Sequence, residues 1–254
     1  MNVRAWVTKI LGLQHRYDKV VEIFNDFGLK GKLLDAAAKH GRISRKLREI
    51  GFDVIAADIN PIDFPSQEIP ILIADFTQGL PCKSATFDYV LCSNGIEYLE
   101  DPYYFVRECY RVLKAGGKLV IETPNTMNLQ SRVSNLLVGF YRFNGRPYDE
   151  VSEDLGGEHR MNPQNYYQLR FNLHRNGFRI IGVTTHEFSN KAMAFFPAFP
   201  FIYMATYRAF KREKKLHQRE RNKEIFQHVM SADLVFGKQL FVLAEKDPRY
   251  QKGI

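Results

Sequence analysis

Short apolar runs typical of β-strands alternate with helical patterns along most of this 254-residue chain. Between the first two runs, Ile43, Leu47 and Ile50 recur at helical spacing, and Gly51 follows them where a helix commonly ends. Strands that alternate with helices in this way build a parallel sheet covered by helices on both faces. The sequence therefore predicts a doubly wound α/β fold, organised as one domain over residues 1–254. The seven expected strands are 32–35, 53–58, 71–74, 87–92, 118–122, 178–183 and 239–244.

Two helices in the middle of the chain have recognisable boundary residues. The pair Asp101 and Pro102 is a good helix start, and the glycines at 116–117 are expected to close that helix. The Asn-Pro pair at 162–163 is expected to open another helix, which ends at Gly177.

Two long segments interrupt the alternation. Residues 123–160, after the fifth strand, are rich in Asn, Gly and Tyr, and we expect them to face the substrate. Residues 185–238, between the last two strands, combine an aromatic stretch at 192–205 with a basic stretch at 211–223. The aromatic stretch is short and contains two prolines, so it does not span a bilayer. It is expected to be a lid over the active site or an element that touches a membrane surface.

The net charge of +8 is concentrated in one place. Seven Lys or Arg and two Glu lie between Lys211 and Lys223, and the rest of the chain is nearly balanced. A protein that binds nucleic acid along a groove would spread its positive charge over the fold. The pattern therefore favours a solvated helix or an anionic membrane surface, and it makes nucleic acid a poor candidate partner.

The cysteines and the beginning of the chain indicate a reducing compartment. Cys82, Cys92 and Cys109 have neither the spacing of a zinc site nor the pattern of a disulfide scaffold, so no bound metal is expected. Lys9 and Arg16 leave no room near the start for the apolar core of a signal peptide. The expected location is the cytoplasm, with the inner face of a membrane as the alternative.

Three aspartates stand at the ends of successive expected strands. Asp58 lies where a carboxylate accepts both ribose hydroxyls of a nucleotide, and Asp75 is placed to accept a hydrogen bond from an adenine amine. Ile59 and Phe76 would then form walls for the adenine ring. One such aspartate is commonly a cap or a turn residue, but together with Asp35 they indicate a nucleotide site at the carboxyl ends of the strands.

These stretches resemble the class I S-adenosylmethionine-dependent methyltransferases. The resemblance is carried by LLDAAAKHGRIS at 33–44, by 57–59 and 74–76, and by 87–99 and 111–117, which are similar to the family's fourth-strand and fifth-strand motifs. It implies a seven-stranded Rossmann-like sheet of order 3-2-1-4-5-7-6 with the last strand antiparallel, and insertions after strands 5 and 6. It also implies S-adenosylmethionine as cofactor and O-methylation of a small molecule, sugar or lipid-linked glycan by in-line methyl transfer.

The first cofactor loop departs from the family pattern, in which three glycines alternate after the acid. Ala37 and Lys39 replace the first two, and Gly41 remains. Ala37 is a mild change if its φ stays negative, whereas Lys39 crowds the cofactor, turns outward or pairs with the cofactor carboxylate. By resemblance, the cofactor-binding residues are Asp35, Ala37, Lys39, Gly41, Asp58, Ile59, Asp75, Phe76, Cys92, Ser93 and Asn94.

Methyl transfer to a hydroxyl is assisted by a general base, and histidine titrates near neutrality. His159, within the first insertion, is the expected base, and a loop histidine that caps the next helix is the alternative. Tyr98, Asn125 and Arg160 are expected to contact the acceptor, and Tyr98 stands where many relatives carry His.

Three other functions compete with this interpretation. Ala37, Lys39 and Tyr98 suggest a cofactor-binding or regulatory protein without turnover. An RNA methyltransferase rests only on the basic charge. A nicotinamide-dependent dehydrogenase fits poorly, because the turn after Asp35 lacks the glycines that let a pyrophosphate approach the backbone.

Overall fold

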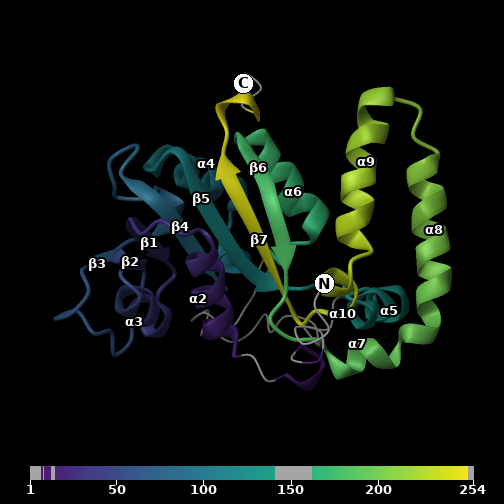
Figure 1. Ribbon diagram of the computed structural model, residues 1–254, viewed down its shortest axis with the longest axis horizontal. Coiled ribbons are helices and arrows are strands. Elements are labelled where there is room, and N and C mark those ends of the chain that lie inside the picture. Colours follow the sequence, from purple (N-terminus) through teal and green to yellow (C-terminus); the bar gives the residue numbers. More distant parts are fainter. Residues whose placement is uncertain (1–6, 8, 13–14, 141–161, 251–254) are drawn as a thin grey trace. The chain divides into compact units, whose positions relative to one another are not determined.

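The computed structural model describes residues 7, 9–12, 15–140 and 162–250 of the chain. Its strands form one sheet of order β3-β2-β1-β4-β5-β7-β6, as expected (Figure 1). Strands β1 to β5 pair in parallel, and β7 runs antiparallel. The predicted doubly wound fold is therefore confirmed. The strands are β1 Lys32–Ala36, β2 Asp53–Asp58, β3 Ile71–Ile73, β4 Phe87–Ser93, β5 Leu113–Pro124, β6 Phe178–Thr184 and β7 Gln239–Lys246.

The chain divides into two compact units. Among the described residues, the sheet unit comprises 15–123, 162–182 and 241–250, and the helical unit comprises 7, 9–12, 124–140 and 183–240. The organisation as a single domain stays a prediction. The sheet unit carries α2 Arg16–Asp26, α3 Arg42–Glu49, α4 Pro102–Val112 and α6 Tyr166–Arg175; the helical unit carries α5 Leu129–Val138, α7 Asn190–Ala194, α8 Phe199–Lys211, α9 Leu216–Val229 and α10 Ala232–Phe236.

Apolar side chains hold α2 and α3 against the sheet. Phe24 of α2 is fully buried and makes edge contacts with Phe52 and Tyr89, at ring-centroid distances of 5.6 and 5.8 Å. Leu47 of α3 is also fully buried in this cluster. Each such side chain contributes about 2–3 kcal/mol by leaving water. The packing fixes the start of α2, where Arg16 lies, relative to the sheet.

Two helix boundaries differ from the sequence-based prediction. The glycines at 116–117 lie inside β5, and α4 already ends at Val112. A Cβ on Gly117 would lie 3.1 Å from the carbonyl oxygen of Asp88, so this glycine allows a close approach to the neighbouring strand instead of ending a helix. Helix α6 begins at Tyr166, after a capping box formed by Asn165 and Gln168.

Helices α8 and α9 form a hairpin in the helical unit (Figure 1). Phe226 of α9 contacts the rings of Tyr203, Tyr207 and Phe210 of α8, at centroid distances of 5.3, 6.1 and 5.9 Å. No residue of α8 is buried. Within the described residues, no helix has both the length and the apolar character needed to cross a membrane.

Candidate functional site

The carboxyl ends of four parallel strands line one edge of the sheet. In register, Ala36 at the end of β1 lies beside Ala57 of β2 and Cys92 of β4, and Ser93 lies beside Glu122 of β5. Parallel strands are about 4.8 Å apart, so polar groups that close neighbouring strands come within reach of one ligand. This edge is the candidate cofactor site, in the position that doubly wound folds use for ligands.

Three residues in the loop after β1 have left-handed backbone conformations, and two of these three are not glycine. The φ angles are +68° at Ala37, +46° at Lys39 and +66° at Gly41. Ala37 would be a mild replacement for glycine only with a negative φ, and its φ is positive. The loop is tied down because the Ala37 and Ala38 amides both donate to the carbonyl of Ala57, at 2.9 and 3.2 Å. A left-handed residue other than glycine costs about 1–2 kcal/mol, so this loop is strained.

Ala37 and Gly95 form a matched pair in this loop region. A Cβ on Gly95 would lie 2.5 Å from the Cβ of Ala37. The methyl group of Ala37 therefore occupies the space in front of Gly95, which follows β4. Alanine at position 37 therefore leaves no room for a Cβ at position 95.

Asp58 closes β2 and holds the strained loop. Its Oδ2 accepts the backbone N–H of Lys39 at 2.8 Å, and its Oδ1 accepts the N–H of Asn60 at 2.9 Å. A carboxylate has about four acceptor positions, so two remain for ligand hydroxyls. Lys39 itself is exposed.

The residues expected to hold an adenine ring lie in different environments. Asp75 is exposed, and its Oδ1 accepts hydrogen bonds from the amide and the hydroxyl of Thr77, at 2.9 and 2.8 Å. Ile59 is 64% exposed and available as a ring wall. Phe76 is buried against Phe105, with ring centroids 5.5 Å apart, so it supports the site from below the surface.

Asp35 is a buried carboxyl group at the same edge. Its Oδ2 accepts the hydroxyl proton of Ser44 of α3 at 2.5 Å. Burial raises the pKa of Asp35 to about 7, and the charge of Asp58 adds to the rise, while the Ser44 hydrogen bond and Arg16 oppose it. Asp35 therefore titrates near neutral pH, where gain or loss of a ligand cation changes its charge.

Arg16 and Glu122 are site residues that the sequence analysis missed. Glu122 is fully buried, accepts a short hydrogen bond from the Ser93 hydroxyl, and its Oε1 lies 3.8 Å from Nε of Arg16. Nη2 of Arg16 donates to the Ser93 hydroxyl at 3.4 Å. Burial raises the pKa of Glu122, and Arg16 and Ser93 oppose the rise.

Both residues carry a signal that was available in the sequence. Glu122 is an acid that closes an apolar strand, as the three aspartates do. Arg16 stands at the start of a helix, where the helix dipole disfavours a cation. Such a placement indicates that the positive charge of Arg16 interacts with a group outside its own helix.

Other predicted residues lie near the same edge. Cys92 is fully buried, and burial raises the pKa of its thiol far above the ordinary value, so it packs in the core as a neutral group. Asn94 has a φ of +50°, and its backbone N–H donates to the backbone carbonyl of Glu122 at 2.8 Å. Tyr98 is half-buried and ends a short 3₁₀ helix. Glu97 in that helix is fully buried and accepts from the Thr123 hydroxyl at 3.1 Å.

Asn125 has a structural position in the helical unit. It is fully buried, and its Nδ2 donates to the carbonyls of Leu234 and Gly237, at 2.8 and 3.0 Å. Its Oδ1 accepts the N–H of Met127 at 2.9 Å. The side chain thus joins the loop after β5 to α10 and the residue that follows it, and no exposed group is left for the expected contact with the acceptor.

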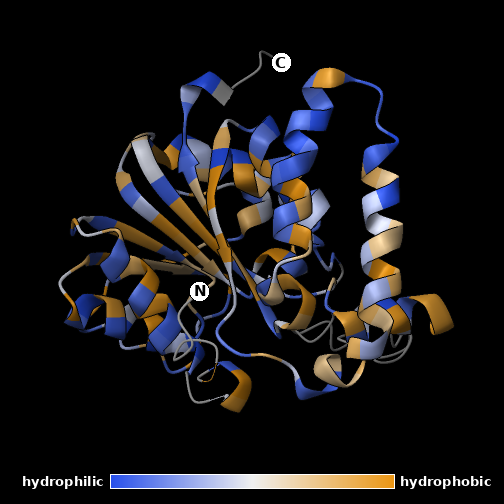
Figure 2. Ribbon diagram, turned by 45° about the vertical axis from the view of Figure 1, so that its right-hand side comes forward, coloured by the Kyte–Doolittle hydropathy of each residue, from blue (hydrophilic) through white to orange (hydrophobic). Residues whose placement is uncertain are grey.

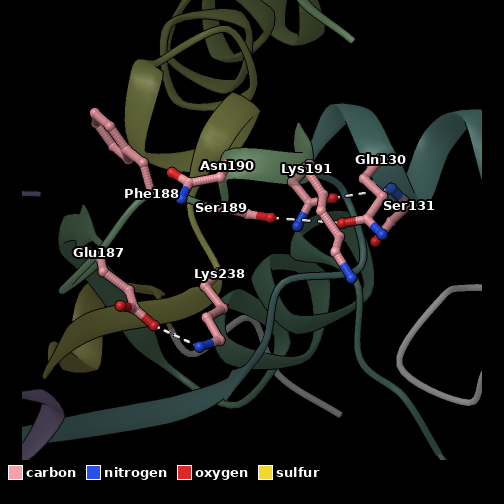
Figure 3. Close-up of a pocket in the computed structure, with 9 residues that line it drawn as sticks. Gln130, Ser131, Glu187, Phe188, Ser189, Asn190, Lys191 and Lys238 are labelled. Atoms are coloured by element: carbon pink, nitrogen blue, oxygen red, sulfur yellow. Dashed lines mark hydrogen bonds and ion pairs between the residues drawn. The ribbon is translucent and has the colours of Figure 1, made fainter. Parts of the chain in front are cut away.

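A polar cavity of about 500 Å³ lies in the helical unit (Figure 3). Figure 3 shows Lys238 paired with Glu187, at 2.7 Å, and Ser189 bonded to Gln130, at 3.4 Å. The cavity is lined by Asn128, Gln130, Ser131, Glu187, Phe188, Ser189, Asn190, Lys191 and Lys238. The lining side chains include hydrogen-bond donors and acceptors, and both positive and negative charges. Such a lining suits a ligand rich in hydroxyl groups.

His159 and Arg160 lie outside the described residues, as does most of the segment after position 140. Their expected roles stay predictions. Within the described ranges, no group of three or more His, Cys, Asp or Glu side chains has an arrangement that could hold a metal ion.

Comparisons with known proteins find methyltransferases. Residues 34–121 match the family described as "Methyltransferase domain". A ubiquinone biosynthesis O-methyltransferase of Xanthomonas oryzae is 29% identical over 110 residues, which is 37% of this chain and 43% of that protein. A protein of the same name from Coxiella burnetii is 30% identical over 129 residues, 48% of this chain and 51% of that protein. The chain thus spans about half the length, or less, of these curated relatives.

Solved structures share the fold at low sequence identity. A SAM-dependent methyltransferase from Archaeoglobus fulgidus has a TM-score of 0.59 and 18% identity, with 91% of this chain and 92% of that chain covered. Phosphoethanolamine N-methyltransferase 2 of Haemonchus contortus, in complex with S-adenosyl-L-methionine, has a TM-score of 0.53 and 16% identity, with 92% and 53% covered.

Proposed function

We propose that this chain, whose residues 34–121 form a class I S-adenosylmethionine-dependent methyltransferase domain, methylates a hydroxyl group of a small molecule. The cofactor of the domain is S-adenosylmethionine. The observation that carries the proposal is the set of acids near the carboxyl ends of β1, β2 and β5, namely Asp35, Asp58 and Glu122, with Arg16 beside Glu122.

The side chains at the sheet edge suit the parts of this cofactor. Asp58 keeps free acceptor positions for the ribose hydroxyls, and Asp75 and Ile59 are exposed beside it for the adenine. Arg16 would bind the carboxylate of the methionine part, and Asp35 with Glu122 would bind its ammonium group. Loss of a proton from Asp35 would accompany that pairing, since a neighbouring cation favours the charged carboxylate.

The protein's share of the chemistry is positioning, exclusion of water and proton removal. Bound S-adenosylmethionine supplies a methyl group on a positively charged sulfur. The transfer needs a hydroxyl oxygen held in line with that group, and it needs no metal or covalent residue. We propose that His159 takes the hydroxyl proton, with Tyr98 and Arg160 orienting the acceptor.

The acceptor is proposed to be a sugar or a lipid-linked glycan. The curated relatives are named for ubiquinone biosynthesis, and they support a small-molecule acceptor in general terms. The cavity lined by Gln130, Lys191 and Lys238 is polar, which favours a ligand with many hydroxyl groups. A lipid-linked acceptor would bring the enzyme to the inner face of a membrane.

Calorimetric titration with S-adenosylmethionine and S-adenosylhomocysteine tests the cofactor, and an acceptor screen for S-adenosylhomocysteine release tests turnover. Micromolar cofactor binding with release on a glycan acceptor supports the proposal. Binding without turnover on any acceptor would favour a regulatory protein, a reading that the strained loop at Ala37 and Lys39 also supports.

The base is tested by comparing His159→Ala with His217→Ala, which removes an exposed histidine of α9. A loss of kcat of about 100-fold or more in the first variant alone, with unchanged cofactor affinity, supports His159 as the base. Equal activity of the two variants would contradict it.

A further inference from the structure

The outer side of α8 is apolar at its beginning and basic at its end. Phe201, Met204 and Ala205 are exposed on one side, and Arg208 and Arg212 continue the same side at helical spacing. The opposite side faces α9, where Tyr203, Tyr207 and Phe210 contact the ring of Phe226. Since the helix rises 1.5 Å per residue, the exposed side extends over about 16 Å.

The exposed apolar groups are large, and they extend beyond α8. Phe201 is 78% exposed, and Leu136 and Leu137 at the end of α5 are 83% and 74% exposed. Figures 1 and 2 both draw the end of α5 beside the beginning of α8, and Figure 2 shows hydrophobic colour on both. A water-facing protein surface rarely gathers side chains of this size, and such patches commonly contact membranes or other proteins.

The positive charge near α8 favours a membrane surface over another protein as the partner. Seven Lys or Arg lie between Lys211 and Lys223, and none of them forms an ion pair with an acid among the described residues. Tyr203 and Tyr207 contact Phe226 on the α9 side of α8, so they do not belong to this outer side. Large exposed apolar side chains beside a dense group of cations without ion pairs match the surface of an anionic bilayer.

We propose that α8, with the end of α5, docks the protein onto an anionic lipid bilayer. Phe201, Met204, Leu136 and Leu137 enter the acyl-chain boundary, and Arg208, Arg212 and the basic residues of 211–223 contact the phosphate groups. The apolar area and the cations act together, since Lys and Arg side chains near an anionic surface are attracted to it and add to the binding by apolar insertion. The biological purpose rests on the proposed function, because a lipid-linked acceptor is reached from such a surface, but the binding itself requires no turnover.

Co-sedimentation with vesicles tests the proposal. The full chain is mixed with phosphatidylcholine vesicles with or without 30% phosphatidylglycerol, and bound protein is measured as salt is raised. We expect binding only to the anionic vesicles, a decrease with salt, and a loss of at least tenfold in Phe201→Glu and in Arg208→Glu/Arg212→Glu. The matched control is Leu29→Glu, which changes a leucine of the sheet unit that is 79% exposed and should leave binding unchanged.

Three outcomes would overturn the proposal. These are no binding of the native chain to anionic vesicles, equal binding of Phe201→Glu, and a dimer in ultracentrifugation that Phe201→Glu dissociates while vesicles remain unbound. Calorimetry with S-adenosylmethionine on the same samples shows that Phe201→Glu is folded. It also separates a failure of membrane docking from a failure of the proposed methyl transfer.

Discussion

The Oδ2 atom of Asp58 lies 2.8 Å from the backbone nitrogen of Lys39 and accepts its hydrogen. The proposed ribose-binding carboxylate is thus the same group that holds the strained loop after β1. Cofactor affinity and loop conformation are therefore coupled through one side chain.

Asp58→Ala is expected to reduce S-adenosylmethionine affinity at least 100-fold, because it removes the ribose acceptor and frees the Lys39 amide. Calorimetric titration measures the change. Asp53→Ala is the control, since Asp53 is an exposed residue at the other end of the same strand. Unchanged binding by Asp58→Ala would refute the assignment of the ribose site.

Gly95→Ala is expected to destabilise the protein by about 2 kcal/mol or more, because its new methyl group overlaps that of Ala37. Ala37→Gly removes the overlap and relieves a positive φ, so the double variant should recover most of the stability. Denaturant unfolding of the four proteins completes the cycle. Additive effects of the two substitutions would show that the residues do not interact.

Lys39→Gly is expected to raise the free energy of unfolding by about 0.5–1 kcal/mol, since glycine adopts a φ of +46° without strain. The reverse test in the same loop is Gly41→Ala, whose Cβ would lie 2.6 Å from the ring of Phe64 and should destabilise. Equal changes in the free energy of unfolding for the two variants would mean that the loop adjusts its conformation without strain. Cofactor titration of Lys39→Gly also shows whether the lysine hinders or assists binding.

The seven strands and the acids near their ends were predictable because apolar runs and closing acids are local patterns, whereas the strand order followed from the resemblance to the class I methyltransferases. The conformation at Ala37 was not, since it depends on Ala57 and Gly95, which are distant in sequence. The glycines at 116–117 were assigned to a helix end for the same reason: the contact of Gly117 with Asp88 on a neighbouring strand cannot be read from the segment itself. Asn125 looked available because its partners, Leu234 and Gly237, follow it by more than a hundred residues.

The stability of the protein is expected to fall as pH rises from about 4 to 7, through Asp35. The folded-state pKa of about 7 is above the ordinary value of 3.8, so in this window the folded chain keeps a proton that the unfolded chain has released. Asp35→Asn removes this contribution, and its stability relative to the native protein should improve as pH rises. Urea unfolding at several pH values measures this, with Asp53→Asn as control; parallel curves for Asp35→Asn and the native protein would contradict the prediction.

Asn125→Ala is expected to lower the free energy of unfolding by about 2–4 kcal/mol, because three buried hydrogen bonds lose their partner. Lys191→Ala, which changes an exposed side chain on the wall of the polar cavity, should leave stability nearly unchanged and raise the KM for the acceptor. Thermal unfolding and steady-state kinetics distinguish the two roles. A raised KM with normal stability in Asn125→Ala would restore that residue to the acceptor site.

Arg16→Ala is expected to weaken S-adenosylmethionine binding at least tenfold and to destabilise the fold by about 2 kcal/mol, because Glu122 stays buried without its nearest cation. The double variant Arg16→Ala/Glu122→Gln removes the uncompensated charge, so stability should recover while affinity does not. Arg16→Lys keeps the charge and should retain more affinity than Arg16→Ala. If the double variant recovers affinity together with stability, Arg16 serves only to neutralise Glu122, and the carboxylate of the cofactor is bound by another group.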